Sequence, residues 1–194
     1  MRMSPAQKAE TRQRIKDAAY RLFRDGGIDA VGVDAVMGQA GLTHGGFYGH
    51  FASKEALAAE VCSDSLARSA DKWERMLAES GSEAALARIV GGYLDPVIAQ
   101  GSERSAEHGC VLPMLGPELA RRPESRPGLT AAMRRMVAVL ASCLPRRRRP
   151  ARERALAGLA TMVGAVTLAR VADDPDFAAE ILAAARAAVG GDRA

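Results

Sequence analysis

Apolar residues recur at helical spacing along almost the whole chain, and this spacing constrains the fold more than any other feature of the sequence. Residues 5–25, for example, place Ile15, Ala19 and Leu22 on one face of a helix. Hydrophobic residues make up 48% of the 194 residues but aromatic residues only 4%. The interior is therefore aliphatic and rich in alanine, which favours closely packed helices over a sheet. The sequence predicts an all-α protein.

Glycine and proline mark where the predicted helices end. Gly26 and Gly27 follow the first helix, and a serine-flanked Gly81 separates two later ones. The further helices are predicted over residues 33–40, 53–79, 86–94, 126–144, 151–172 and 175–189. Between 109 and 119, several glycines and prolines predict a short, irregular helix.

The stretch of residues 40–57 is unusual because its short central helix carries Gly45, Gly46 and Gly49. Each glycine costs about 1 kcal/mol of helix stability relative to alanine, so a bare backbone must serve another purpose. Close approach to a ligand or another backbone is the usual one. A helix over residues 33–40, a turn containing Gly41, and a second short helix beginning after Thr43 form the helix-turn-helix pattern, whose second helix enters the DNA major groove.

These residues resemble the DNA-binding head of the TetR-type (TetR/AcrR) one-component transcriptional repressors. The resemblance covers residues 12–60. It rests on the following residues: Ala18, Ala19, Leu22, Phe23, Gly27, Ala40, Gly41, Leu42, Thr43, Gly45, Phe47, Tyr48, His50, Phe51, Ser53, Lys54, Glu55 and Leu57. It implies a three-helix head at residues 1–52 and a helical ligand-binding and dimerisation domain at residues 53–194.

The resemblance also assigns roles to residues of the head. Phosphate contacts are implied for Thr43, Tyr48, His50 and Lys54, and positions against base edges for His44, Gly45, Gly46 and Phe47. No Arg or Lys lies between residues 35 and 53, so this helix cannot read guanine through a bidentate contact. We therefore expect base readout to depend on His44, on Phe47 against thymine methyl groups and on flanking basic residues. The alternative for His44 is that it points into solvent.

Basic residues gather in two places. Seven of the first 24 residues are Arg or Lys, against only Glu10 and Asp17, which is a composition suited to phosphates. Four arginines occupy residues 146–149 between Pro145 and Pro150. A nucleic-acid contact is one interpretation of that run, and we favour the other, an exposed loop between helices.

The body suits a cavity for an apolar effector, with aromatic walls and adaptable thioethers. The candidate lining residues are Trp73, Leu77, Tyr93, Cys110, Met114, Met133 and Met136. The alternative is that these side chains are ordinary core. Within the resembling family, a subgroup carries a Gly-Cys segment like Gly109–Cys110, and some of its members sense electrophiles or oxidants through that cysteine. A helix start and a protonated His108 would lower the thiol pKa of Cys110, whereas a buried, inert cysteine is the alternative.

The last two helices are built from small residues, and the first of them is apolar around nearly its whole circumference. Pattern and resemblance together predict a homodimer through these two helices, which would place two reading helices on a palindromic operator. By family analogy, a small molecule would release the DNA. The small residues could instead fill an ordinary core.

Other classes of protein find little support. The sequence contains no HExxH or GxSxG motif, so we expect neither an enzyme nor a metal or cofactor site. Three widely spaced cysteines predict reduced thiols, and no secretory signal or apolar run long enough to span a membrane is expected, so the protein should be cytoplasmic. The competing hypothesis is a helical ligand-binding protein whose head binds DNA weakly.

Overall fold

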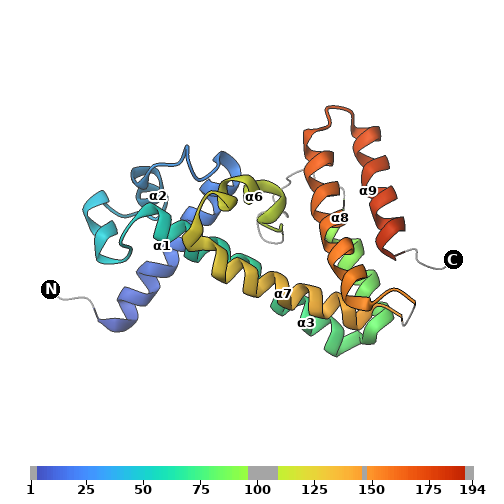
Figure 1. The fold of residues 1–194 in the computed structure, drawn as a ribbon. Helices are drawn as coiled ribbons and strands as arrows, with labels where there is room; N and C mark the ends of the chain where they lie inside the picture. Colours follow the sequence, from blue (N-terminus) through green and yellow to red (C-terminus); the bar gives the residue numbers. More distant parts are fainter. Residues whose placement is uncertain (1–3, 96–108, 146–147, 191–194) are drawn as a thin grey trace. The chain divides into compact units, whose positions relative to one another are not determined.

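The computed structural model describes residues 4–95, 109–145 and 148–190, which are largely helical and contain no strand (Figure 1). The prediction of an all-α fold is confirmed. In chain order the elements are α1 (Pro5–Gly26), α2 (Val33–Gln39), the 3₁₀-helix η1 (His44–Gly49), α3 (Lys54–Tyr93), α6 (Leu112–Ala120), the 3₁₀-turn η2 (Pro123–Ser125), α7 (Arg126–Cys143), α8 (Ala151–Val171) and α9 (Pro175–Gly190).

Helix α1 begins and ends at the residues that its sequence specifies. Ser4 and Gln7 form a capping box: the Gln7 N–H donates to Ser4 Oγ at 3.2 Å, and the Ser4 N–H donates to Gln7 Oε1 at 2.8 Å. At the other end, Gly27 takes a φ of +82° and its N–H donates to the Phe23 carbonyl oxygen at 2.8 Å. This left-handed residue turns the chain so that Ile28 enters the core.

The turn between α2 and η1 is closed by a Schellman motif around Gly41, whose φ is +69°. The Leu42 N–H donates to the Met37 carbonyl oxygen at 2.8 Å, and the Gly41 N–H donates to that of Gly38 at 3.0 Å. The Arg14 guanidinium donates to the Ala40 carbonyl oxygen at 2.5 Å and so ties α1 to the same turn. The geometry of the helix-turn-helix is therefore fixed by backbone bonds.

The chain divides into two compact units. The first contains the residues up to Ser65 together with Met114–Thr130, so α6 and the start of α7 pack with the N-terminal helices. Its core consists of fully buried side chains: Ile15, Phe23, Ile28, Met37, Phe47 and Leu57. At one close approach in this unit, a Cβ added to Gly128 would lie 2.5 Å from Ser63 Oγ. The predicted division into domains at residues 1–52 and 53–194 stays a prediction.

Helix α3 starts where Ser53 caps it, with the Ala56 N–H donating to Ser53 Oγ at 3.1 Å. The predicted break around Gly81 is present as a kink inside one long helix, because Gly81 has a φ of +74° and a ψ of 174°. The part of α3 beyond Ser65 belongs to the second unit, where Arg135 of α7 pairs with Asp71 and Glu74.

Helices α8 and α9 complete the second unit and lie side by side as an antiparallel hairpin (Figure 1). A Cβ added to Gly158 would lie 3.4 Å from Val189 Cγ1, an ordinary contact distance, so this glycine packs directly against α9. By length and composition alone, α8 is long and apolar enough to cross a membrane. In this structure α8 packs against α9, and its Leu168 and Val171 side chains remain exposed.

Candidate nucleic-acid interface

The short helix η1 displays a polar surface above an aromatic anchor. Thr43, His44 and Tyr48 are exposed, with Tyr48 66% accessible, whereas Phe47 is completely buried. The rings of Phe47 and Tyr48 meet edge to face with centroids 5.3 Å apart. Phe47 thus holds the element to the core and leaves Tyr48 to project outward.

One expectation from the sequence requires correction. We expected Phe47 against base edges, but its 0% exposure leaves no surface with which to reach a thymine methyl group. The short helix predicted after Thr43 is present as a 3₁₀-helix of six residues. Its three glycines weaken helix propensity, which is consistent with this tighter and shorter form.

The glycines of η1 have no packing reason for their missing side chains. A Cβ added to Gly45 or Gly49 would meet no described atom within 4 Å, and one added to Gly46 would make only an ordinary contact of 3.5 Å with Met37 Cε. Neither Gly45 nor Gly49 has a positive φ. No contact within the described part of the chain therefore requires glycine at these two exposed positions. The remaining reason for a bare backbone is close approach by an external partner.

The two histidines of the element differ in environment. His44 Nδ1 lies 2.5 Å from Asp34 Oδ1 of α2, which fixes the ring and leaves Nε2 for an outside partner. The pKa of His50 is lowered by its burial and by the nearby charges of Lys8 and Arg12. His50 is therefore neutral at pH 7 and meets an anion as a hydrogen-bond donor rather than as a cation.

Lys54 also departs from the expectation that it contacts a phosphate. Its Nζ donates to the carbonyl oxygens of Ile28 at 2.9 Å, Asp29 at 3.3 Å and Val31 at 3.1 Å. An ammonium group has three donors, so all of them are used inside the head. In this structure Lys54 stabilises the turn between α1 and α2.

Most of the basic residues of α1 are likewise engaged internally. Arg12 pairs with Glu60 at 2.5 Å and lies 4.0 Å above the Phe51 ring, and Lys16 pairs with Glu60 and Asp64. Lys8 is exposed, and no carboxylate of the described residues lies within ion-pair distance of it. Because its charge is felt at His50, Lys8 is a cation on the same surface, a role that sequence reasoning did not single out.

A cluster of charged side chains ties α6 to the turn that follows α1. Glu118 Oε2 accepts the N–H groups of Ile28 at 2.8 Å and Asp29 at 3.0 Å, across 90 residues of sequence. The buried Arg122 pairs with Asp29 and donates to the Glu118 carbonyl oxygen at 2.8 Å. This cluster makes α6 part of the head's support, and the sequence offered no pattern by which to find it.

The predicted effector-lining residues stand mostly in the second unit, apart from Met114, which belongs to the first. Met136 is fully buried and Trp73 is 5% exposed, as core residues are. The Trp73 and Tyr93 rings approach edge to face at 6.0 Å. None of the seven predicted residues, Trp73, Leu77, Tyr93, Cys110, Met114, Met133 and Met136, lines the large cavity described below. Their role in effector binding stays a prediction.

Cys110 does not have the activated environment expected from its position. Burial raises the pKa of its thiol, and the nearby Tyr93 hydroxyl and Leu112 N–H only oppose that rise. The expected contribution of His108 lies outside the described residues. Burial likewise raises the thiol pKa of Cys62, to about 12, and that of Cys143.

No group of three or more His, Cys, Asp or Glu side chains with metal-binding geometry occurs among residues 4–95, 109–145 and 148–190. The polar groups of the head instead form a solvent-facing surface without a catalytic constellation. These groups can hydrogen-bond to the phosphate backbone of a nucleic acid and approach the base edges in its groove. The fold and this surface define a helix-turn-helix DNA-binding head joined to a helical body.

Comparison with known proteins agrees with that class. Residues 15–61 match the family model of the bacterial regulatory proteins of the tetR family. Over 60 residues the chain is 37% identical to the HTH-type transcriptional regulator AcrR of Shigella flexneri, a match that spans 31% of this chain but only 28% of AcrR.

Solved structures extend the likeness to the whole fold. The crystal structure of the reduced form of E. coli NemR has a TM-score of 0.77 at 21% identity and covers 94% of this chain and 96% of its own. A TetR-family transcriptional regulator of Streptomyces coelicolor has a TM-score of 0.75 at 19% identity and covers 95% and 96%. The head at residues 15–61 thus matches the tetR family model, and the whole chain shares its fold with a solved TetR-family regulator. Membership of a Gly-Cys subgroup stays a prediction.

Proposed function

We propose that this protein is a dimeric DNA-binding transcriptional repressor that acts in the cytoplasm and is released from a palindromic operator by a small molecule. The single observation that carries the proposal is the exposed surface of η1, where Tyr48 and His44 project beside Gly45 and Gly49, two glycines that no internal contact requires. Such a surface allows the backbone to approach DNA closely.

In this proposal, most contacts of the head position it on the duplex. Thr43, Tyr48 and His50 donate to phosphates, and Lys8 adds a positive charge beside them. The Nε2 atom of His44 is the main group left for a base edge, because Asp34 occupies Nδ1. With so few base contacts, specificity rests largely on the spacing of two heads and on the shape of the DNA.

The dimer is proposed to form through α8 and α9. Among the described residues, four of the five exposed large hydrophobic side chains lie on these two helices: Leu156 at 48%, Leu168 at 60%, Val171 at 80% and Phe177 at 54%. Along α8 they fall at helical spacing on the face opposite its core contacts. An exposed apolar stripe of this kind is typical of a subunit interface. Replacing Leu168 with Glu should convert the dimer to a monomer in sedimentation velocity, and an unchanged dimer would contradict this interface.

Release by an effector is proposed to act through α6. The Glu118 and Arg122 contacts connect this helix to the turn before α2, so a displacement of α6 changes the support of the reading element. A coupling of roughly 1–3 kcal/mol is the usual size for such a link. The identity of the effector is not specified by these contacts.

The test of the proposal is DNA binding itself. Fluorescence anisotropy and footprinting with the DNA upstream of the gene should show a protected, two-fold symmetric site. Tyr48→Ala should weaken binding about equally to all sequences, by roughly thirtyfold for a dimer that loses two phosphate contacts of about 1 kcal/mol each. Arg152→Ala, at an exposed residue of α8, is the control and should bind as the wild type does. Absent or salt-independent binding would favour the competing ligand-binding protein.

An alternative trigger is modification of Cys110 by an electrophile or oxidant. Two features favour testing it: the nearby Tyr93 hydroxyl and Leu112 N–H act to lower the thiol pKa, and the fold is similar to that of a protein whose structure was determined in a reduced form. The net rise of the pKa through burial argues against a fast reaction. Cys110→Ser should abolish release of DNA by an electrophile, and unchanged release would end the thiol hypothesis.

A further inference from the structure

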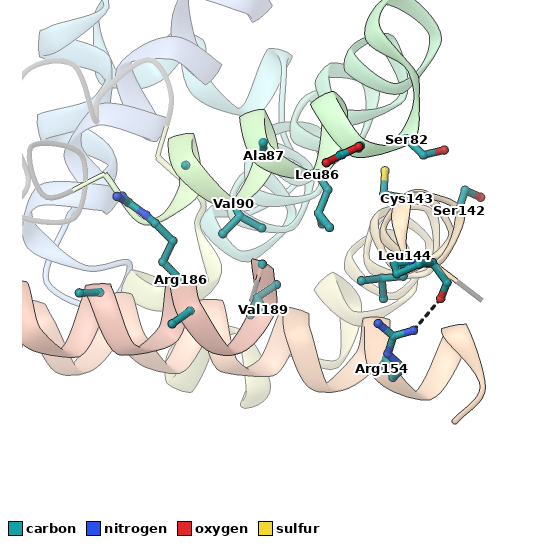
Figure 2. A pocket seen from close by; sticks show the side chains of 16 residues that line it. Ser82, Leu86, Ala87, Val90, Ser142, Cys143, Leu144, Arg154, Arg186 and Val189 are labelled. Atoms are coloured by element: carbon teal, nitrogen blue, oxygen red, sulfur yellow. Dashed lines mark hydrogen bonds between the residues drawn. The ribbon is translucent and has the colours of Figure 1, made fainter. Parts of the chain in front are cut away.

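A cavity of about 1040 Å³ lies in the second unit, between the later part of α3, the end of α7, the start of α8 and α9. Its walls are mostly aliphatic: Leu86, Val90, Leu144, Ala183, Ala187 and Val189 (Figure 2). This volume is at the upper end of the range of about 300–1,000 Å³ that is typical of small-molecule sites. The cavity is therefore large enough for an organic molecule with an extended apolar body.

The charged groups of the cavity are predominantly cationic. Among the described residues, Arg154 and Arg186 line it together with a single carboxylate, that of Glu83. Figure 2 shows the two guanidinium groups on either side of Val189, with Leu86 and Val90 facing them from α3. An apolar space with an excess of guanidinium groups at its margins is complementary to an amphipathic anion.

Arg186 keeps most of its donors for a ligand. One of its terminal nitrogens donates to the Leu94 carbonyl oxygen at 3.0 Å, and no carboxylate of the described residues pairs with it. A guanidinium has five N–H donors, so the single bond to Leu94 orients the fork without exhausting it. Arg154 also lines the cavity and donates to the Pro145 carbonyl oxygen at 2.8 Å, the bond that is dashed in Figure 2.

The cavity stays accessible in the proposed dimer. The residues of α9 that line it are Ala183, Arg186, Ala187, Val189 and Gly190. Phe177, Ile181, Ala184 and Ala188 form the apolar stripe on another face of α9. At about 100° per residue, the centres of these two faces lie roughly 160° apart around the helix. A subunit on the stripe therefore leaves the cavity face of α9 uncovered.

From this geometry we propose that the cavity is a binding site for an amphipathic organic monocarboxylate, whose carboxylate pairs with Arg186 and whose apolar body packs on Leu86, Val90 and Val189. Binding by itself is independent of DNA. Only the further step, that such an anion is the effector, rests on the proposed function as a repressor.

Titration calorimetry with three ligands of equal chain length separates the effect of the head-group charge on affinity from that of burying the alkyl chain. Decanoate should bind to the full chain about tenfold more tightly than decan-1-ol, and decylammonium should bind most weakly. Arg186→Met keeps the aliphatic stem and should remove the preference for decanoate, whereas Arg152→Met, at an exposed residue of α8 outside the cavity, should retain it. Ala187→Trp should weaken all three ligands, because it fills the cavity from a position on its lining.

Several results would overturn the site. They are equal binding of decanoate and decan-1-ol, a preference for decanoate that survives Arg186→Met, or unchanged binding in a folded Ala187→Trp protein. A DNA-release assay with decanoate then tests the effector role: release from the wild type but not from Arg186→Met supports it, and decanoate binding without release overturns that role alone. A protein that binds decanoate but never binds DNA would contradict the repressor and leave the anion site standing.

Discussion

Replacing Glu118 with Ala should destabilise the first unit strongly, although Glu118 lies far in sequence from the turn that it supports. Its Oε2 atom accepts two backbone N–H groups at 2.8 and 3.0 Å, and its side chain is only 20% exposed. Bonds from neutral donors to a charged acceptor contribute about 1.5–3 kcal/mol each. Taking the lower value for a partly solvated site gives a loss of about 3 kcal/mol, or roughly 6–12 °C in the unfolding midpoint of a chain of this length.

Thermal and urea unfolding measure this effect, and Glu118→Gln should lose about half as much because an amide oxygen still accepts a hydrogen bond. Glu124→Ala is the matched control, since Glu124 is exposed and lies in the adjacent η2 turn. It should change the stability by less than about 0.5 kcal/mol. If Glu118→Ala unfolds at the same denaturant concentration as Glu124→Ala, the reasoning about this cluster is wrong.

A double-mutant cycle sharpens the prediction. A Cβ added to Gly27 would lie 2.8 Å from Glu118 Oε1, and Gly27 has a φ of +82°. Gly27→Ala should therefore destabilise the protein in two ways, through the close contact of its Cβ with Glu118 and through its left-handed backbone conformation. In the Glu118→Ala background only the backbone cost of roughly 1–2 kcal/mol remains. Strict additivity of the two substitutions would refute the contact.

Two further predictions concern the head. Gly45→Ala and Gly49→Ala should leave the free energy of unfolding unchanged or raise it by up to about 1 kcal/mol, because the added Cβ contacts no other atom among the described residues. Both substitutions should nevertheless weaken DNA binding in anisotropy titrations. A loss of stability without a loss of DNA affinity would contradict this prediction. The pKa of Asp29 is held below 3.8 by its hydrogen bond from Arg122. Its contribution to stability is thus complete above that pH and is lost as the pH falls through the folded-state pKa. Between about pH 5 and about pH 3 the wild type should therefore lose more stability than Asp29→Asn, and parallel curves would count against the pair.

The helices and their ends were predictable because they depend on local signals. Ser4, Gly27 and Ser53 cap or stop helices through bonds within a few residues, and the prediction of a break at Gly81 needed only its position between serines. Exposed Tyr48 and the bare glycines of η1 also followed from the sequence, because their pattern resembles that of one family.

The roles of Phe47, Lys54 and Glu118 were not accessible in this way because each depends on contacts formed by folding. Phe47 faces the core, since Tyr48 next to it takes the outward direction. Lys54 finds three carbonyl oxygens in a turn about 25 residues earlier, and Glu118 finds its partners 90 residues earlier. The cavity at Arg186 is likewise lined by residues from four helices. The spacing of methionine and aromatic residues along single helices therefore predicted other lining residues.

The salt dependence of DNA binding tests the central claim most directly. Release of counterions makes the logarithm of the affinity fall linearly with the logarithm of salt concentration, with a slope of about −0.9 per phosphate neutralised. The wild type should show a steep slope, and Lys8→Gln should reduce it by about one unit per head, whereas Lys72→Gln, an equal loss of charge on the later part of α3, should leave it unchanged. A flat slope for the wild type, or equal effects of Lys8→Gln and Lys72→Gln, would contradict a DNA-binding surface at η1.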